Sequence, residues 1–405
     1  MGLVGLVGLS RVVRWSGLSG LSWVDRCFGR AQEESGIRLR FLYLLPRENR
    51  HGSILQRYFI RERSSAEQHA FAEQHDYTAQ SCMEFLKPII QRIDKELSQL
   101  DLPQNPASLY DPQRYILSTG GKRFRPALTL MACGLCGEDP EKALPAALAV
   151  EMLHNFTLIH DDMMDQADSR RSFATVHKKW DTSVAILSGD SLYTEALWQL
   201  QNLDPAIDFR AMNRCFLEGI RAVCEGQALD MEFETRNDVR LGEYITMIQG
   251  KTGGLISAAL QMGGIAAGCG ADRLAKLHHL GMSLGIGFQM QDDWLDVVAD
   301  QTKFGKQTGG DIREGKKTCI LLSAMERCNK EEIIWLQNCL EKKPMPDEDV
   351  LDIIGLFERT GALEETKNEF LGYYRQALDD LDAFEPSSHK QDLTRLLETL
   401  MMRDY

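Results

Sequence analysis

Two short runs of aspartate share one spacing in this sequence. The first run is Asp161, Asp162 and Asp165, and the second is Asp292, Asp293 and Asp296. On an α-helix, residues four positions apart differ by only about 40° around the axis, so the outer carboxylates of each run project from one face. Each run follows a strongly apolar stretch, 154–160 or 284–291, where like charges need a compensating cation. Mg²⁺ fits these donors best, because it takes oxygen ligands and commonly bridges carboxylates to substrate phosphates. An acidic helix end without a ligand is the alternative, and the second copy counts against it.

Basic residues lie beside these runs or beside glycines at four places. The groups are Lys122, Arg123 and Arg125 after Gly120-Gly121; Arg170 and Arg171; Lys251 before Thr252-Gly253-Gly254; and Lys306, Lys316 and Lys317 within residues 304–318. Glycine allows close backbone approach to a ligand, and Arg binds phosphate through two parallel hydrogen bonds. Each group alone would be ordinary solvated surface. Together with two metal-type runs, the four groups predict a diphosphate site.

The elements that must position these residues are helices. Apolar residues recur at spacings of three and four, for example in 83–100 and 393–405, and strand-like alternation is absent. Glycine and proline divide residues 77–405 into about a dozen segments. Residues 143–160 are apolar on nearly every face, which is typical of a central helix. The sequence predicts one large all-α domain over 77–405.

Composition excludes several other classes of protein. The 405 residues are 43% hydrophobic and 26% charged, an ordinary globular balance, and no apolar stretch is long enough to cross a membrane. The formal net charge of −13 argues against nucleic-acid binding.

Residues 1–76 differ from the rest of the chain. They carry eleven Arg, no Lys and eight acidic residues, so their charge is +3 and that of the remainder is −16. This composition resembles a transit peptide, and an over-long reading frame that truly begins near Met83 is an equal alternative. We expect this extension to be disordered. We also expect a cytoplasmic protein, or a mitochondrial or plastid one if the extension is a transit peptide.

Ten cysteines are scattered through the chain. Only Cys133 and Cys136 have CxxC spacing, and no second pair completes a zinc site. We expect reduced core thiols of an intracellular protein rather than a redox motif.

Seven motifs occur in a set order along the chain. They are GGKRFRP, EMLHNFTLIHDDMMD, the Arg170-Arg171 pair, EGQALD, KTGG, FQMQDDWLD and GKQTGGDIREGKKT. In this order they resemble the trans-isoprenyl diphosphate synthases, over about residues 83–405. The resemblance implies an all-α fold of about a dozen helices around a deep central apolar cavity, usually in a homodimer. It also implies Mg²⁺-dependent head-to-tail condensation of isopentenyl diphosphate with an allylic diphosphate.

The same resemblance implies roles for individual residues. Three Mg²⁺ would be held mainly by Asp161, Asp165 and Asp292, with Asp162, Asp293 and Asp296 in support. The allylic diphosphate would bind Arg170, Lys251, Thr252, Gln289, Lys306 and Lys316. Isopentenyl diphosphate would bind Lys122, Arg125, Arg171 and His154, the last within an ExxH element that starts at Glu151. One departure from the family pattern is Ser172, where glycine usually follows the Arg pair.

The implied reaction needs no protein nucleophile. Metals and fixed cations stabilise the departing pyrophosphate, the allylic carbon–oxygen bond ionises, and the double bond of isopentenyl diphosphate attacks the carbocation. The departing pyrophosphate is the expected base for the final proton, and an apolar cavity protects the cation from water.

Product length is expected to depend on bulk before the first aspartate run. Phe156 lies five residues before Asp161, and the neighbouring Thr157 is small. In the resembled family this combination favours geranylgeranyl diphosphate, with farnesyl diphosphate second and longer polyprenyl products as a further alternative. Phe156 as plain core is the simpler interpretation.

Two competing functions stay open at this point. A terpene cyclase shares the first aspartate run, but the second run and the basic group at 122–125 count against it. A non-catalytic subunit that regulates a partner synthase usually loses part of an aspartate run, and both are intact here.

Overall fold

The computed structural model describes residues 84–298 and 309–403. All of them belong to one unit that runs from residue 80 to residue 405. The extension over residues 1–76 and Lys306 lie outside the described residues, so the predictions for them stay predictions.

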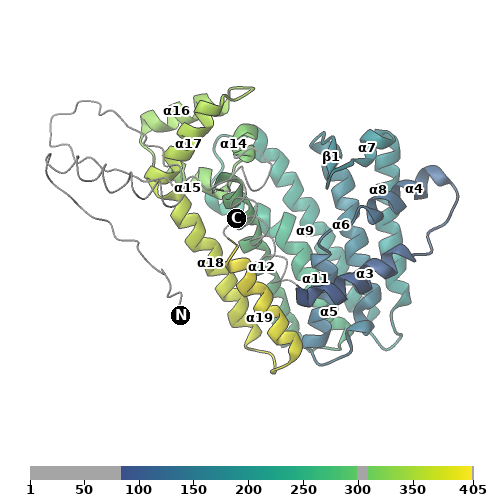
Figure 1. The fold of residues 1–405 in the computed structure, drawn as a ribbon. Coiled ribbons are helices and arrows are strands. Elements are labelled where there is room, and N and C mark those ends of the chain that lie inside the picture. Colours follow the sequence, from purple (N-terminus) through teal and green to yellow (C-terminus); the bar gives the residue numbers. More distant parts are fainter. Residues whose placement is uncertain (1–83, 299–308, 404–405) are drawn as a thin grey trace, which may run out of the picture. The chain divides into compact units, whose positions relative to one another are not determined.

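The described chain is almost entirely helical, which confirms the all-α prediction (Figure 1). In chain order the elements are η1 (Glu84–Leu86), α3 (Lys87–Ser98), α4 (Ala107–Ser118), α5 (Phe124–Leu135), η2 (Pro140–Ala143), α6 (Leu144–Met164), β1 (Ser169–Arg170), β2 (Phe173–Ala174), α7 (Val176–Lys179), α8 (Thr182–Gln199), η3 (Leu200–Asn202), α9 (Phe209–Thr235), α10 (Leu241–Ile248), η4 (Gln249–Gly253), α11 (Gly254–Ala266), α12 (Ala271–Val298), α14 (Gly310–Glu314), α15 (Cys319–Arg327), α16 (Lys330–Leu340), α17 (Asp347–Thr360), α18 (Ala362–Leu381) and α19 (Ser388–Met401).

Helix α11 lies at the centre of the bundle, packed against α5, α6, α9 and α12 (Figure 1). Twelve of its thirteen residues are buried, because its sequence is apolar or small on every face. The predicted central helix α6 is likewise buried over most of its length. These helices place the ends of α6 and α12, where the aspartate runs lie, on rigid supports.

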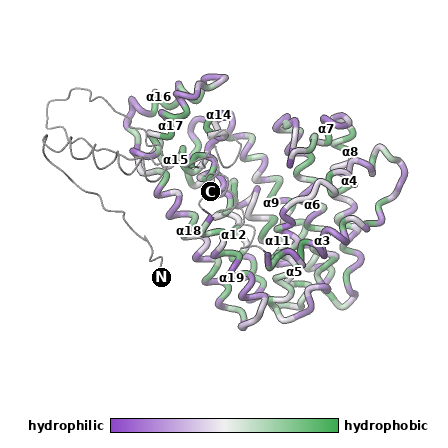
Figure 2. The backbone as a smooth tube through the Cα atoms, in the orientation of Figure 1, coloured by the Kyte–Doolittle hydropathy of each residue, from purple (hydrophilic) through white to green (hydrophobic). Residues whose placement is uncertain are grey.

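The outer helices are amphipathic. Hydrophilic and hydrophobic residues alternate along α18 and α19, whose apolar faces pack inward (Figure 2). Beyond the end of α12 a smaller apolar cluster joins α15, α16 and α17 around Ile320, Leu336 and Ile353. No helix in the described part of the chain is long and apolar enough to cross a membrane.

One short hairpin interrupts the helical pattern, and the sequence did not predict it. Ser169 pairs with Ala174 and Arg170 with Phe173 in antiparallel register. The two turn residues have positive φ, 54° at Arg171 and 65° at Ser172. Such a two-residue turn favours glycine because the left-handed conformation strains residues with a side chain. Ser172 therefore keeps the backbone shape of the expected glycine at a cost in local stability.

Candidate active site

The first aspartate run lies where α6 ends. Asp161 and Asp162 belong to the last helical turn, and Asp165 is the C-cap residue, whose N–H donates to the Asp161 carbonyl at 2.9 Å. The run therefore does begin on a helix, as its spacing predicts. Asp162 is the buried member, 1% exposed, and burial raises its pKa.

Arg170, from the hairpin, holds two of these carboxylates. Its Nε donates to Asp162 Oδ1 at 2.6 Å, and its Nη2 donates to Asp161 Oδ2 at 3.3 Å. Asp162 Oδ2 is buried and has no hydrogen-bond partner. One carboxylate oxygen of this run is thus left for another ligand.

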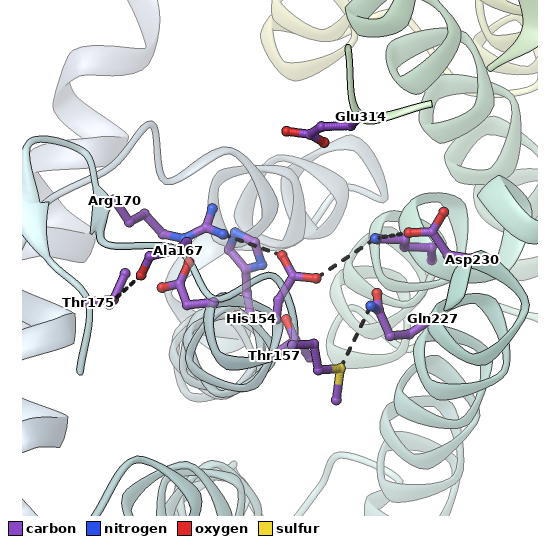
Figure 3. Close-up of polar contacts among 12 residues, drawn as sticks. His154, Thr157, Ala167, Arg170, Thr175, Gln227, Asp230 and Glu314 are labelled. Carbon is purple, nitrogen blue, oxygen red and sulfur yellow. Dashed lines mark hydrogen bonds and ion pairs between the residues drawn. The ribbon is translucent and has the colours of Figure 1, made fainter. Parts of the chain in front are cut away.

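Lys251 approaches the same run from η4, a single π-helical turn between α10 and α11. Its Nζ lies 2.5 Å from Asp230 Oδ2 of α9 and 3.8 Å from Asp161 Oδ1. Figure 3 shows Arg170 and Asp230 on opposite sides of the end of α6. Arg170 contacts Asp161 directly, and Asp230 is connected to Asp161 through Lys251. Asp230 is the last residue of the EGQALD motif, but no role was expected for it, because its contact with Lys251 depends on the crossing of α9 with η4.

The second run lies within the last turns of α12. Its middle member, Asp293, is buried and has both oxygens bonded: Tyr244 Oη donates to Oδ2 at 2.6 Å and Gln289 Nε2 to Oδ1 at 2.9 Å. Burial raises the pKa of Asp293 to about 7. Gln289 Oε1 accepts from Thr252 Oγ1 at 2.9 Å, so the two polar residues predicted for the allylic diphosphate do contact each other.

The outer members of the second run are less enclosed. Asp292 Oδ1 accepts from Arg403 Nη1 at 3.0 Å, and Asp296 Oδ2 accepts from the N–H of Asp311 at 2.9 Å. Burial raises the pKa of both carboxyls. Arg403 is a site residue that sequence reasoning missed. Its backbone carbonyl is held by Gln291 Nε2 at 3.0 Å, which fixes the end of the chain beside α12.

Lys316 pairs with two acidic side chains of α14. Its Nζ pairs with Asp311 at 3.2 Å and with Glu314 at 2.8 Å. Burial raises the pKa of Asp165 and of Asp296, and the positive charge of Lys316 opposes part of this rise. The turn η4 reaches both runs, because Lys251 lies 3.8 Å from Asp161 and the adjacent Thr252 donates to Gln289, which holds Asp293. The ends of α6 and α12 therefore face the same space. Figure 3 shows Glu314 opposite Arg170 and Asp230.

A second, more cationic group lies beside this space. Arg125 Nη1 is 3.2 Å from His154 Nε2, and the Arg171 guanidinium donates to the Gly120 carbonyl. Burial lowers the pKa of Arg125, of Arg171 and of Lys122, with neighbouring cations acting in the same direction. Burial and these arginines also hold the pKa of His154 well below its usual value. The buried Nε of Arg125 has no partner. Crowded cations that repel one another, one of them with a buried free donor, make a site for an anion.

Glycine shapes this cationic group. Gly120 has φ 75° and Gly121 φ 144°, and a Cβ on Gly121 would lie 2.7 Å from Arg171 Nη1. The guanidinium therefore occupies the space that a side chain would fill.

One expectation for this group is wrong. Arg123 does not face the diphosphate space, because its buried guanidinium pairs with Glu151 at 2.6 Å and with Asp94 at 2.8 Å. It also donates to the Leu117 carbonyl at 2.8 Å. Its charge is neutralised within the fold, so of the three cations in this segment only Lys122 and Arg125 stay candidates for binding a diphosphate.

The donor set suits a hard divalent cation that keeps part of its water shell. Every side chain in the two runs offers carboxylate oxygen, and Asp162 Oδ2 is unpartnered. Within residues 84–298 and 309–403 no three metal-binding side chains converge into a closed cage. Carboxylate oxygens are the donors that Mg²⁺ takes, commonly one or two of them together with substrate phosphates.

The residues predicted to control product length lie on α6. Phe156 packs edge-on against His160, with ring centroids 4.8 Å apart, and against Tyr193 of α8 at 5.7 Å. Tyr193 in turn stacks on Phe216 of α9 at 6.2 Å. Thr157 Oγ1 donates to the His154 carbonyl at 2.8 Å. Three helices thus contribute to one aromatic stack below the first aspartate run.

Known proteins share this fold and sequence. Residues 106–357 match the family model for polyprenyl synthetase. The chain belongs to the polyprenyl synthetase family. It is 36% identical over 315 residues to a geranylgeranyl diphosphate synthase of Methanosarcina mazei, with 77% of this chain and 95% of that protein aligned. A geranylfarnesyl diphosphate synthase of Natronomonas pharaonis is 33% identical, with 75% and 92% aligned. The solved geranylgeranyl pyrophosphate synthetase of Pyrococcus horikoshii is 32% identical, with a TM-score of 0.74 over 82% of this chain and all of that one.

These relatives confirm the resemblance inferred from the seven motifs. The chain is an enzyme of the short-chain trans-prenyltransferase class and has the isoprenoid synthase fold.

Proposed function

We propose that the protein catalyses the Mg²⁺-dependent head-to-tail condensation of isopentenyl diphosphate with an allylic diphosphate, and that its main product is geranylgeranyl diphosphate. The observation that carries this proposal is the turn η4, whose Lys251 pairs with Asp161 of the first run and whose Thr252 donates to Gln289, which holds Asp293 of the second. Two aspartate runs facing one space, beside a cationic group, suit two diphosphates bound next to each other.

Charge complementarity supports three Mg²⁺ per site. Three such ions would neutralise the six aspartates of the two runs, with Asp161, Asp165 and Asp292 as the principal ligands. The lysines and arginines would then balance the two diphosphates. Bound Mg²⁺ supplies electrostatic stabilisation of the charge that develops on the leaving pyrophosphate.

The chain itself orients both substrates. Arg170, Lys251 and Lys316 each pair with carboxylates, and these contacts hold the three cations around the allylic diphosphate. Lys306 would join them from the segment that the structure does not describe. Thr252 and Gln289 fix each other, and Gln289 also holds Asp293, so the second run is positioned by the same network.

Isopentenyl diphosphate would bind the cationic group of Lys122, Arg125, His154 and Arg171. The low pKa of His154 keeps its ring neutral, so that it can accept a hydrogen bond from Arg125 or donate one to phosphate. The anion would relieve the repulsion between the neighbouring guanidinium groups of Arg125 and Arg171. The two diphosphates would then lie side by side, which brings the reacting carbons together.

The product assignment rests on the aromatic stack and on the relatives. Phe156 packs on Tyr193, which in turn stacks on Phe216. The end of the stack toward the first run is therefore bulky, while Thr157 beside Phe156 is small. The M. mazei relative and the P. horikoshii structure are both named as geranylgeranyl synthases. A 20-carbon product is consistent with one aromatic barrier.

A homodimer is supported by exposed apolar side chains on two neighbouring helices. They are Ile186, Leu187 and Trp198 on α8, and Phe209 and Leu217 on α9. Trp198 is 71% exposed and Leu187 61%. Large apolar groups left in water on adjacent helices mark a protein contact. Leu187→Glu should give monomers in analytical ultracentrifugation, whereas Leu351→Glu on α17, where the leucine is 67% exposed, should not.

Product analysis tests the proposal. The purified protein is incubated with Mg²⁺, labelled isopentenyl diphosphate and each allylic primer in turn, and the dephosphorylated alcohols are separated by chain length. We expect a 20-carbon alcohol from every primer that is accepted. Asp161→Ala and Asp292→Ala should each lower turnover by about a hundredfold or more, as loss of an electrostatic stabiliser does. Asp352→Ala, an exposed aspartate of α17, is the matched control and should keep wild-type turnover. No condensation with any primer would favour a non-catalytic subunit.

A further inference from the structure

Two cysteines that are distant in sequence lie at the end of the bundle where α5 ends and α12 begins, away from the aspartate runs. Cys136 is the C-cap residue of α5, and Cys269 lies in the turn between α11 and α12. Both cysteines line one cavity, and each thiol acts on the pKa of the other. They are 133 positions apart, so no local spacing could have indicated the pair.

The CxxC spacing points to a different pair, and the structure does not support it. The thiol of Cys133 is buried and donates to the Asp139 carbonyl at 3.3 Å. Burial raises its pKa to about 12, which keeps it protonated and unreactive. The partner of Cys136 is therefore Cys269.

Small molecules can reach the pair. Cys136 and Cys269 are both partly exposed, and both line a cavity of about 410 Å³. The other lining residues include Gly268, Gly270 and Arg273. The cavity falls within the size range of sites for small ligands.

The surroundings of Cys269 favour its thiolate. Gly270 caps the start of α12, since its carbonyl accepts from the N–H of Leu274 at 3.1 Å, and Cys269 comes directly before it. A helix N-terminus and a nearby guanidinium, here that of Arg273, stabilise negative charge on sulfur. The neighbouring Cys136 thiol, and after it the charge of Arg273, lowers the pKa of Cys269, whereas the pKa of Cys136 is raised. Cys269 is thus the thiol better suited to act as the nucleophile.

We propose that Cys136 and Cys269 are a thiol–disulfide exchange site that forms a reversible intramolecular disulfide with small-molecule disulfides such as glutathione disulfide. The Cys269 thiolate attacks one sulfur of glutathione disulfide and releases one glutathione thiolate. Cys136 then gives up its proton and attacks the Cys269 sulfur, which releases the second glutathione. Two protein thiols lose two electrons, and one glutathione disulfide becomes two glutathione thiols.

The bond would join the end of α5 to the start of α12. It would close a long loop in the unfolded chain, and long loops gain most from a cross-link. We expect the oxidised protein to melt about 5–10 °C above the reduced protein. The proposal is independent of the prenyltransferase reaction.

Peptide mapping tests the proposal directly. The full-length protein is equilibrated in glutathione buffers from fully reduced to fully oxidised, alkylated and digested with trypsin. Cys133 and Cys136 share the peptide 124–142, and Cys269 lies in 252–273. A cross-linked pair of these peptides that dithiothreitol separates is the expected result. It should persist in Cys133→Ser and in Cys224→Ser, and disappear in Cys269→Ser together with the shift in melting temperature.

Three results would overturn the proposal. A disulfide confined to peptide 124–142 would show that the CxxC pair is the redox site. A stable glutathione adduct on Cys269 without cross-linking would show that Cys136 cannot reach it. Free thiols at both positions in the most oxidising buffer would show that the pair does not exchange.

Discussion

Helix α9 crosses the turn η4 at Gly226, and this crossing fixes the position of Lys251. A Cβ on Gly226 would lie 2.1 Å from the backbone N of Lys251, whereas ordinary contact begins at 3.4 Å, so the two backbones would have to separate by about 1.3 Å. The next contacts, at 2.7 Å, are backbone atoms of Gly250 and Lys251, so no rotation of a side chain could relieve the overlap. Gly226→Ala should lower the free energy of unfolding by about 1–3 kcal/mol through overpacking.

The same displacement should impair catalysis. Lys251 Nζ would move relative to Asp230 and Asp161, which now lie 2.5 and 3.8 Å away. A misplacement of about 1 Å in a positioning group costs roughly a hundredfold in rate. We therefore expect kcat/KM of Gly226→Ala to fall by about a hundredfold.

Scanning calorimetry and steady-state kinetics on purified variants measure both effects. Gly242→Ala and Gly372→Ala are matched controls, because no atom lies within 4 Å of the added Cβ at either helical position. Both should retain wild-type rates and stability within about 1 kcal/mol. A Gly226→Ala protein with wild-type melting temperature and kcat/KM would refute the packing of α9 on η4.

Three further substitutions have definite expected outcomes. Phe156→Ala removes the first ring of the aromatic stack, and the next residue on that face of α6, Met152, lies about 6 Å further along the helix axis. Chromatography should therefore show products about one five-carbon unit longer, and an unchanged chain-length distribution would contradict the role of Phe156. Ser172→Gly relieves the left-handed turn of the hairpin and should stabilise the protein by about 0.5–1 kcal/mol in urea unfolding; a loss of stability would refute the strain argument. Tyr244→Phe removes the 2.6 Å hydrogen bond that the tyrosine hydroxyl donates to the buried Asp293, and it should lower the free energy of unfolding by about 1–3 kcal/mol. An unchanged urea midpoint would mean that this bond contributes nothing to stability.

The sequence predicted those features that depend on local spacing. The all-α architecture followed from apolar periodicity, and the family followed from seven motifs in order. The prediction that Asp161 and Asp165 lie on one face of a helix depends only on their spacing of four. The structure places Asp161 in the last turn of α6 and Asp165 at its C-cap.

Features that depend on tertiary contacts could not be predicted. Arg403 reaches Asp292 across 111 positions, and Tyr244 reaches Asp293 across 49. Arg123 was grouped with Lys122 and Arg125 because the three are neighbours in sequence. Its backbone is left-handed, with φ 46°, and its buried guanidinium instead pairs with Glu151. Charge density along the chain does not reveal which charges the fold itself neutralises.

The central claim is that the two aspartate runs bind diphosphate through Mg²⁺. Isothermal titration with a non-ionisable thio-analogue of farnesyl diphosphate, in Mg²⁺ and then in EDTA, tests it most directly. We predict binding in Mg²⁺ that is lost in EDTA and in Asp161→Ala, and that is retained in Asp352→Ala. Equal affinity with and without Mg²⁺ would contradict the account.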